Sequence, residues 1–240
     1  MNKESIGVLG DEALVESVAA AGAEPVTGTV STVSDLAAVV VSGESALLEL
    51  AHSGTDATVL AVSPTVSGLR SVEPADVTAA CERLLADDYT IDGHSLLAAA
   101  SSSTTAHALL DVTLLTAESA RISEYSISLD GERLTRFRAD GVVVSTPAGS
   151  SGYGRAAGGP LVTPAADSLA AAPISPFSID SNRWVLPTDG VSLAVERDEA
   201  EVLLCVDGDA VAEVRPETPV RIDAVDRLEV AVVPESTPVF

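Results

Sequence analysis

Lysine and aromatic residues are scarce in this chain. Lys3 is its only lysine, and 13 basic residues face 36 acidic ones, for a formal net charge of −23. Because no stretch is rich in basic residues, the composition argues against nucleic-acid binding. The acidic residues are spread along the chain rather than gathered in one interaction tail. This pattern is typical of a protein that works in molar salt, which screens the repulsion among carboxylates.

Cysteines are few, and long apolar runs are missing. Cys81 and Cys205 stand alone, without a CxxC pair or metal-ligand spacing, which favours ordinary thiols in a reducing cytosol. The longest apolar region, residues 96–117, is interrupted by Ser101, His107 and Asp111, so we do not expect it to span a bilayer. Asn2-Lys3-Glu4 leads into a short Ile6–Leu9 strand and not into a long apolar run, so we expect no signal peptide. We therefore expect a cytoplasmic protein with no membrane partner and no protein-held metal.

The first third of the chain alternates short apolar runs with helical patterns. Strands are predicted at Ile6–Leu9, Leu36–Val41 and Thr58–Val62, and helices at Glu12–Ala21, Ala46–His52 and Pro74–Ala86. Such alternation predicts an α/β domain with a parallel sheet, which we place at residues 1–90. Ligands of these sheets bind at the carboxyl ends of the strands, where Ser42-Gly43-Glu44 would lie.

The remainder, residues 91–240, is predicted to be a mostly β domain. Turn signals occur at Asp130-Gly131 and Asp207-Gly208. Few helical patterns fit between the strands, and we expect an active site in the cleft between the two domains. The predicted strands are Val112–Leu115, Glu124–Leu129, Val142–Ser145, Trp184–Leu186, Val191–Val195, Val202–Val206 and Val220–Ile222.

The segment Asp140–Pro160 carries the strongest functional signal. A β-branched run leads into a turn rich in Gly, Ser and Thr that contains Tyr153 and ends at Gly158-Gly159-Pro160. Glycine lets backbone N–H groups approach an anionic or ribose-bearing ligand, because it lacks a Cβ and tolerates positive φ. A flexible linker has a similar composition. The valine run before the turn favours a ligand loop.

This segment and two later ones resemble the ATP-dependent NAD kinase family, whose members share a block close to DG-x-x-x-x-TPTGSTAY followed by GGP. Taken together, ordered matches over about residues 138–210 are far more specific than one short motif. The matching residues are Asp140-Gly141, Thr146–Tyr153, Gly158–Pro160, Pro173–Ser178, Asn182-Arg183, Val185–Pro187 and Val206–Gly208.

The resemblance implies that this block binds the nicotinamide dinucleotide. Arg138 matches a basic residue that can meet a phosphate, and it could equally be a surface arginine. Tyr153 could also be a half-buried ring of the core. By position, the residues in contact with the substrate would be Asp140, Ser151, Gly152 and Tyr153.

The amino-terminal half departs from the family pattern. Family members carry GGDGT, whose glycines surround the phosphates of ATP and whose aspartate is the base for the ribose 2′-hydroxyl. Ser42–Ala46 reads Ser-Gly-Glu-Ser-Ala, so Gly43 remains in the phosphate loop and Glu44 takes the place of the base. Glu44 also suits a helix N-terminus. Asp111 aligns with an acidic residue that holds the adenosine end, or it is a strand-edge acid.

Two functions follow from the resemblance. The first is an NAD kinase of a salt-loving, haloarchaeal-like kind, which would use ATP or another phosphoryl donor, NAD and a divalent metal such as Mg²⁺ that bridges phosphates. The second is an inactive NAD(P)-binding relative that acts as a sensor or as a partner of an active paralogue. Family members are homo-oligomers, which implies the same for this chain.

Overall fold

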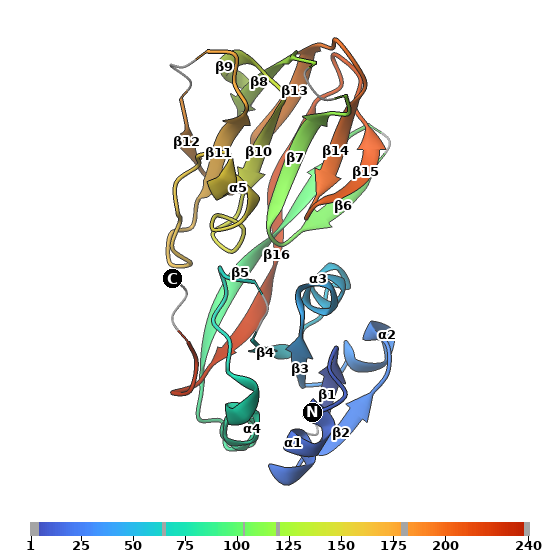
Figure 1. Cartoon of the computed structure of the whole chain (residues 1–240), viewed down its shortest axis with the longest axis vertical. Helices are drawn as coiled ribbons and strands as arrows, with labels where there is room; N and C mark the ends of the chain where they lie inside the picture. Colours follow the sequence, from blue (N-terminus) through green and yellow to red (C-terminus); the bar gives the residue numbers. More distant parts are fainter. Residues whose placement is uncertain (1–4, 64–65, 103, 119–120, 179–181, 238–240) are drawn as a thin grey trace. The chain divides into compact units, whose positions relative to one another are not determined.

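The chain folds into two compact units. The structure is a computed structural model that describes residues 5–63, 66–102, 104–118, 121–178 and 182–237. The first unit comprises Met1–His94 with Asp226–Phe240, and the second comprises Ser95–Val225. Two strands, β5 (Thr90–Ala100) and β16 (Val220–Val232), carry the chain from one unit to the other (Figure 1).

A parallel sheet forms the centre of the first unit. Its strands follow the order β2-β1-β3-β4-β16, and β1, β3 and β4 pair in parallel register, for example Val40 with Leu60. Val39, Val40 and Val41 are completely buried, as expected for a parallel strand that is covered on both faces. The bounds are β1 (Ser5–Leu9), β2 (Glu24–Thr27), β3 (Ala38–Ser42) and β4 (Thr58–Val62).

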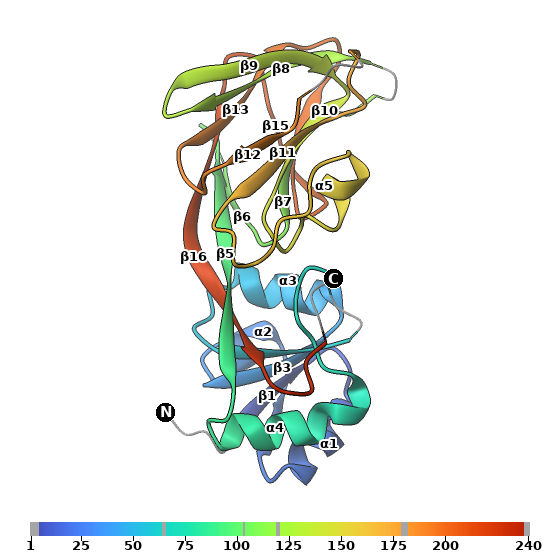
Figure 2. The same cartoon turned by 90° about the vertical axis from the view of Figure 1, so that its left-hand side faces the viewer.

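Helices cover both faces of this sheet. Ile6, Val8 and Val40 pack with α1 and α4 in one apolar cluster, whereas Gly7 faces Val33 of α2. Figure 2 shows α1 and α4 together on one side of β1 and β3, with α3 on the other. The helices are α1 (Leu14–Ala20), α2 (Val30–Val33), α3 (Glu44–His52), the 3₁₀ turn Pro74–Asp76 and α4 (Val77–Leu85).

The end of the chain belongs to the first unit. In β16, Val230 pairs in parallel with Val59 of β4, and Ala231 and Val233 join the cluster beneath α1 and α4. A single division near residue 90 therefore differs from the observed one, because residues after Asp226 return to the first unit. Local sequence patterns carry no information on this long-range pairing.

The second unit is built from antiparallel strands in two layers. One layer follows the order β12-β11-β10-β7-β14-β15, and the other contains the run β16-β13-β8-β9. In Figure 1, β7, β10 and β14 lie side by side. The strands are β6 (Thr105–Ala108), β7 (Asp111–Thr116), β8 (Ser123–Leu129), β9 (Glu132–Ala139), β10 (Gly141–Ser145), β11 (Leu169–Ile174), β12 (Trp184–Leu186), β13 (Val191–Arg197), β14 (Val202–Val206) and β15 (Asp209–Glu213).

One apolar core lies between these two layers. Leu114 and Val142 contribute from the first layer, and Ile127 and Leu193 contribute from the second, all of them completely buried. The short helix α5 (Tyr153–Ala156) is the one helix among the described residues of this unit. The predicted fold class, an α/β part followed by a mostly β part, is therefore confirmed. Across the described ranges, no helix has the length and hydropathy needed to cross a membrane.

Candidate functional site

The Gly-rich block follows a fully buried strand. All five residues of β10 are buried, and residues 146–152 form the turn that leads into α5. The Ser150 hydroxyl donates to the Pro147 carbonyl oxygen at 2.9 Å and accepts from the Val162 N–H at 3.0 Å. Ser150 has no exposed surface. The block is therefore a packed part of the second unit, not a flexible linker.

Packing also explains Gly149. A Cβ at this position would lie 2.0 Å from the Leu110 carbonyl oxygen, so any side chain would collide with backbone. The Gly149 N–H donates to the Thr146 hydroxyl at 3.1 Å, and the Thr146 N–H donates to the same Leu110 carbonyl at 2.9 Å. This glycine allows two backbone segments of the protein to meet, whereas the sequence suggested an approach of ligand to backbone.

Beside the block lies a pocket of about 200 Å³. Asp111 stands at the start of β7 and Tyr153 at the start of α5, and both line this pocket. Tyr153 is 43% exposed, so its ring offers a surface on which a planar group can stack. The complete lining is Asp111, Thr113, Leu115, Tyr153, Cys205 and Gly208.

One residue of the pocket lining, Asp111, has a carboxyl group with an unusual pKa. The pKa of Asp111 is raised from 3.8 to about 6. Burial is the main cause, a hydrogen bond from the Thr113 hydroxyl at 3.1 Å opposes the shift, and the nearby charge of Asp207 adds to it. Burial also raises the pKa of Tyr153 and that of Cys205. Perturbed titratable groups that line a pocket are a physical mark of a ligand site.

Asp140 is fixed by its backbone. Its N–H donates to the Ile174 carbonyl at 2.9 Å, and its own carbonyl accepts from the Thr116 N–H at 2.9 Å and the Tyr125 hydroxyl at 3.2 Å. Tyr125 is completely buried, and its hydroxyl also lies 2.7 Å from the Thr116 hydroxyl. The buried network therefore fixes the backbone of Asp140, whose side chain is half-buried.

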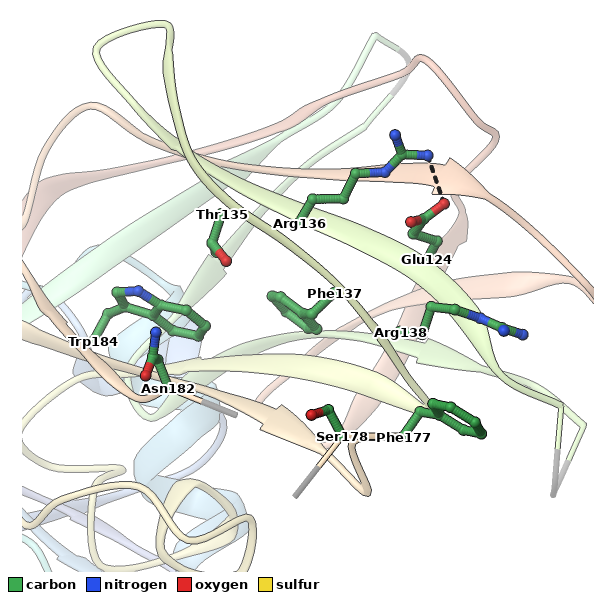
Figure 3. A pocket seen from close by; sticks show the side chains of 9 residues that line it. All are labelled: Glu124, Thr135, Arg136, Phe137, Arg138, Phe177, Ser178, Asn182 and Trp184. Atoms are coloured by element: carbon green, nitrogen blue, oxygen red, sulfur yellow. Dashed lines mark hydrogen bonds and ion pairs between the residues drawn. The ribbon is translucent and has the colours of Figure 1, made fainter. Parts of the chain in front are cut away.

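Arg138 lies in a different hollow of the same unit. Its guanidinium is 5.4 Å from the ring centre of Phe177, at one end of an open groove of about 400 Å³. Figure 3 shows Trp184 at the other end and Phe137 between the two ends, and the rings of Phe137 and Trp184 stack with centres 5.7 Å apart. Arg136 points away toward Glu124, 2.6 Å from its carboxylate. The structure therefore separates Arg138 from the pocket that Asp111 and Tyr153 line.

Gly43 and Glu44 belong to the first unit. Ser42 ends β3, Gly43 has φ +90°, and Glu44 is the first residue of α3. A Cβ on Gly43 would have no atom within 4 Å, so the glycine is needed for its backbone angle and not for space. Glu44 is exposed at the helix N-terminus, where backbone N–H groups favour negative charge.

One charge feature escaped the sequence reasoning. Residues 141–166 contain no aspartate or glutamate, although the chain has 36 acids in 240 residues. Arg155, on α5 two residues after Tyr153, lies within this stretch. Among the described residues, Arg138 and Arg155 form no ion pair, whereas eight other arginines contact a carboxylate in a recorded salt bridge. The sequence signal for this feature was the absence of acidic residues from residues 141–166 of a chain whose acidic residues are otherwise evenly spread.

The predicted site residues therefore fall into four places, one of which is that of Asp140, directly before β10 and outside the lining of both hollows. Asp111 and Tyr153 meet in one pocket, with Ser151 and Gly152 directly before Tyr153 in the loop. Arg138 lies in the aromatic groove, and Gly43 and Glu44 lie in the first unit. Within the described ranges, no group of three or more His, Cys, Asp or Glu side chains could hold a metal ion.

The chain belongs to a class of proteins in which an α/β unit is joined to a layered β unit that contains a buried Gly-rich loop. A family model described as the ATP-NAD kinase C-terminal domain matches residues 109–233, which include the whole block and the pocket. The chain belongs to the NAD kinase family.

Archaeal relatives support this family membership. The chain is 33% identical over 192 residues to the NAD kinase of Thermococcus kodakarensis, a match that covers 77% of this chain and 68% of that protein. It is 31% identical over 189 residues to the NAD kinase of Thermococcus sibiricus, with the same two shares covered.

Solved structures show the same fold. Yeast NADH kinase complexed with NADH superposes with a TM-score of 0.83 at 17% identity, over 97% of this chain and 84% of that one. An NAD kinase from Archaeoglobus fulgidus in complex with ATP gives a TM-score of 0.79 at 18% identity, over 95% of this chain and 92% of that one.

Proposed function

We propose that this protein transfers the γ-phosphate of ATP to the 2′-hydroxyl of NAD and so makes NADP. The observation that carries the proposal is the pocket in which Asp111 and Tyr153 meet beside a loop without carboxylates. A dinucleotide presents flat rings, ribose hydroxyls and phosphates. Tyr153 offers a ring, Asp111 offers an acceptor, and the acid-free loop avoids repelling the phosphates. The names of the relatives point to the same reaction.

In this proposal the second unit binds the dinucleotide. Asp111 accepts a hydrogen bond from a ribose or base group, Tyr153 stacks against a ring, and Ser151 and Gly152 present the loop to the ligand. Asp140 and Arg138 complete the set that the family pattern implies, with Arg138 directed at a phosphate. Arg155 is a further cation beside Tyr153 that a phosphate could contact.

The first unit supplies the groups for phosphoryl transfer. Gly43 and the N-terminus of α3 face the triphosphate, and Glu44 takes the proton of the 2′-hydroxyl. That oxygen bonds to the γ-phosphorus while the bond from the γ-phosphorus to the bridging oxygen breaks, and ADP leaves. A divalent metal such as Mg²⁺, which proteins often hold through one or two carboxylates together with substrate phosphates, would supply neutralisation of the phosphate charge.

A second candidate function rests on the loop that replaces GGDGT. Ser42 and Ser45 bear side chains where the family pattern has glycine, and Glu44 is one methylene longer than aspartate. A displacement of ~1 Å at a reacting group costs on the order of 100-fold in rate. The alternative is therefore an inactive relative that binds NAD or NADP as a sensor or as a partner of an active paralogue.

We also propose that the protein acts as a homo-oligomer in a cytoplasm of high salt. The acidic composition supports a cytoplasm of high salt, because salt screens the repulsion among carboxylates. The family resemblance supports the assembly, and light scattering of the purified chain in KCl tests it.

Turnover separates the two candidate functions. In KCl at ~2 M, chosen to screen the acidic surface, the purified chain with ATP, Mg²⁺ and NAD should produce NADP. Glu44→Gln should lower the rate by at least ~100-fold, the range for loss of a general base. It should leave NAD affinity unchanged. Glu49→Gln is the matched control, because Glu49 is an exposed residue of the same helix.

NAD binding without any NADP formation, across ATP, polyphosphate and several divalent metals, would overturn the kinase proposal in favour of the inactive relative. Equal rates for Glu44→Gln and Glu49→Gln would remove Glu44 from the chemistry. In that case the kinase proposal would need another base.

A further inference from the structure

Three consecutive backbone N–H groups point at one carboxylate in the second unit. Leu109, Leu110 and Asp111 form the turn between β6 and β7, and their N–H groups donate to the Asp207 carboxylate at 2.8, 2.7 and 3.0 Å. Asp207 lies in the turn between β14 and β15, and its own N–H donates to the Asp111 carbonyl at 3.0 Å. Consecutive N–H groups around an anion form a strong, charge-assisted arrangement.

The carbonyl groups of the same turn are held from the opposite direction. The Thr146 hydroxyl donates to the Leu109 carbonyl oxygen at 2.6 Å and lies 3.2 Å from that of Leu110. Gly149 packs on the Leu110 carbonyl, where a Cβ would be 2.0 Å away. The 109–111 turn is therefore clamped between Asp207 and the start of the Gly-rich loop.

This clamp joins the two halves of the candidate pocket. Asp111, which lines the pocket, is the last residue of the turn. Tyr153 stands at the end of the loop that begins at Thr146, and Gly208, next to Asp207, also lines the pocket.

We propose that Asp207 is a positioning residue of the dinucleotide pocket: its carboxylate fixes the 109–111 turn and thereby sets the place of the Asp111 carboxyl group and of the loop that bears Tyr153. The inference rests on the proposed function for the identity of the ligand. It assigns Asp207 no contact with substrate.

The charge of Asp207 gives this role a distinct signature. Burial is the main cause of the raised pKa of Asp111, and the Asp207 charge adds to it. The other titratable groups that face Asp111 are Cys205 on β14 and Tyr153 on α5. Replacement of Asp207 by asparagine should therefore lower the pKa of Asp111, an effect that loss of stability alone does not produce.

The test compares Asp207→Asn with Asp209→Asn. Asp209 is an exposed acid of the same turn region, so it controls for the loss of one negative charge. Three quantities are measured in KCl: hydrogen exchange of the 109–111 amides, the titration midpoint of the Asp111 carboxyl by ¹³C NMR, and the NAD dissociation constant by calorimetry.

In Asp207→Asn we expect faster exchange at all three amides, because an asparagine side chain offers one acceptor oxygen and turns an NH₂ group toward backbone donors. The Asp111 midpoint should fall below its wild-type value. The NAD dissociation constant should rise by about tenfold or more, as for loss of a supporting hydrogen-bond partner behind a ligand group. Asp209→Asn should match the wild type in all three.

Unchanged exchange and an unchanged midpoint in Asp207→Asn would overturn the clamp. Faster exchange and a shifted midpoint with unchanged NAD affinity would overturn the positioning role. If Asp207→Asn does not fold, Asp207→Glu keeps the carboxylate but moves it by one methylene, and exchange and affinity decide in the same way. A wild-type chain that binds no NAD contradicts the proposed function. In that case, hydrogen exchange of the 109–111 amides and the titration midpoint of Asp111 still test the clamp without ligand.

Discussion

The two loops that carry the predicted site residues differ in what holds them. Both follow a completely buried valine run, Val142–Val144 before the Gly-rich block and Val39–Val41 before Gly43. Gly149 in the first loop is wedged against the Leu110 backbone, whereas Gly43 in the second has no atom within 4 Å of its missing Cβ. The first loop is therefore fixed by the protein itself, and the second is shaped by one backbone angle.

This difference bears on the function proposed above. Under that proposal, dinucleotide binding uses a pocket in the second unit beside a loop that the protein itself holds in place. Under the same proposal, phosphoryl transfer uses groups near Gly43, where Glu44 and Ser45 are exposed and the helix has no side-chain cap. Substitutions in the two loops should consequently give unequal effects.

The largest effect is expected for Gly149→Ala. Its Cβ would meet backbone, which cannot rotate away, so we expect a loss of at least ~3 kcal/mol in the free energy of unfolding. Gly43→Ala meets only the strain of φ +90° and should cost about 1–2 kcal/mol. Chemical denaturation in KCl measures both.

Gly93→Ala is the control for these two variants. Gly93 does not have a positive φ, and its added Cβ would be in ordinary contact with the Arg227 side chain at 3.6 Å. We expect its stability within about 1 kcal/mol of wild type. Equal stability of Gly149→Ala and Gly93→Ala would mean that the Leu110 backbone yields easily, and the contrast between the two loops would then be lost.

The next effect concerns Asp111 and pH. Because its folded pKa is about 6 and its unfolded pKa about 3.8, the folded state binds more protons than the unfolded state between these values. The free energy of unfolding therefore falls as pH rises through this window, by at most about 3 kcal/mol. The penalty is fully present above pH 6 and absent below about pH 4.

Asp111→Asn removes this penalty and keeps an acceptor for the Thr113 hydroxyl. Without ligand, the variant should be more stable than wild type at pH 7.5 by about 2–3 kcal/mol, with the difference vanishing near pH 4. Denaturation at both pH values measures it. A difference that does not change with pH would show that Asp111 is not held protonated by burial. Such a gain in stability with weaker NAD binding would mark Asp111 as a residue kept for function.

Much of the fold could be predicted because valine-rich segments can be recognised as strands from the sequence. The predicted bounds of β4, β12 and β14 are the observed ones. Six strands were missed: β2, β5, β6, β9, β11 and β15. Two of them show a clear physical reason. The segment ERLTRFRA of β9 is charged and largely exposed, and β11 is an alanine-rich strand whose burial comes from its neighbours and not from its own propensity.

The site was less accessible from sequence. The resemblance named Asp111 and Tyr153, and the fold then placed both in one pocket. The role of Asp207 could not be read, because its three donors lie 96 to 98 residues away and use backbone atoms that leave no trace in residue type. The separation of Arg138 from that pocket likewise depends on how β9 and the loop after β11 pack, as its contact with Phe177 shows.

The smallest effect is expected from salt, and it should differ along the chain. We expect the free energy of unfolding to rise by about 1 kcal/mol between 0.1 M and 2 M KCl, or roughly 2–4 °C in Tm for a chain of this size. Residues 196–201 contain four acids, whereas residues 141–166 contain none. Amides of the acidic segment should therefore gain more protection from hydrogen exchange than those of the acid-free loop.

Sucrose at matched stabilisation is the control, because it favours compact states without screening charge. A Tm that KCl leaves unchanged would contradict the proposed adaptation, and equal gains in both segments would show that salt acts through solvent exclusion instead of through carboxylate repulsion.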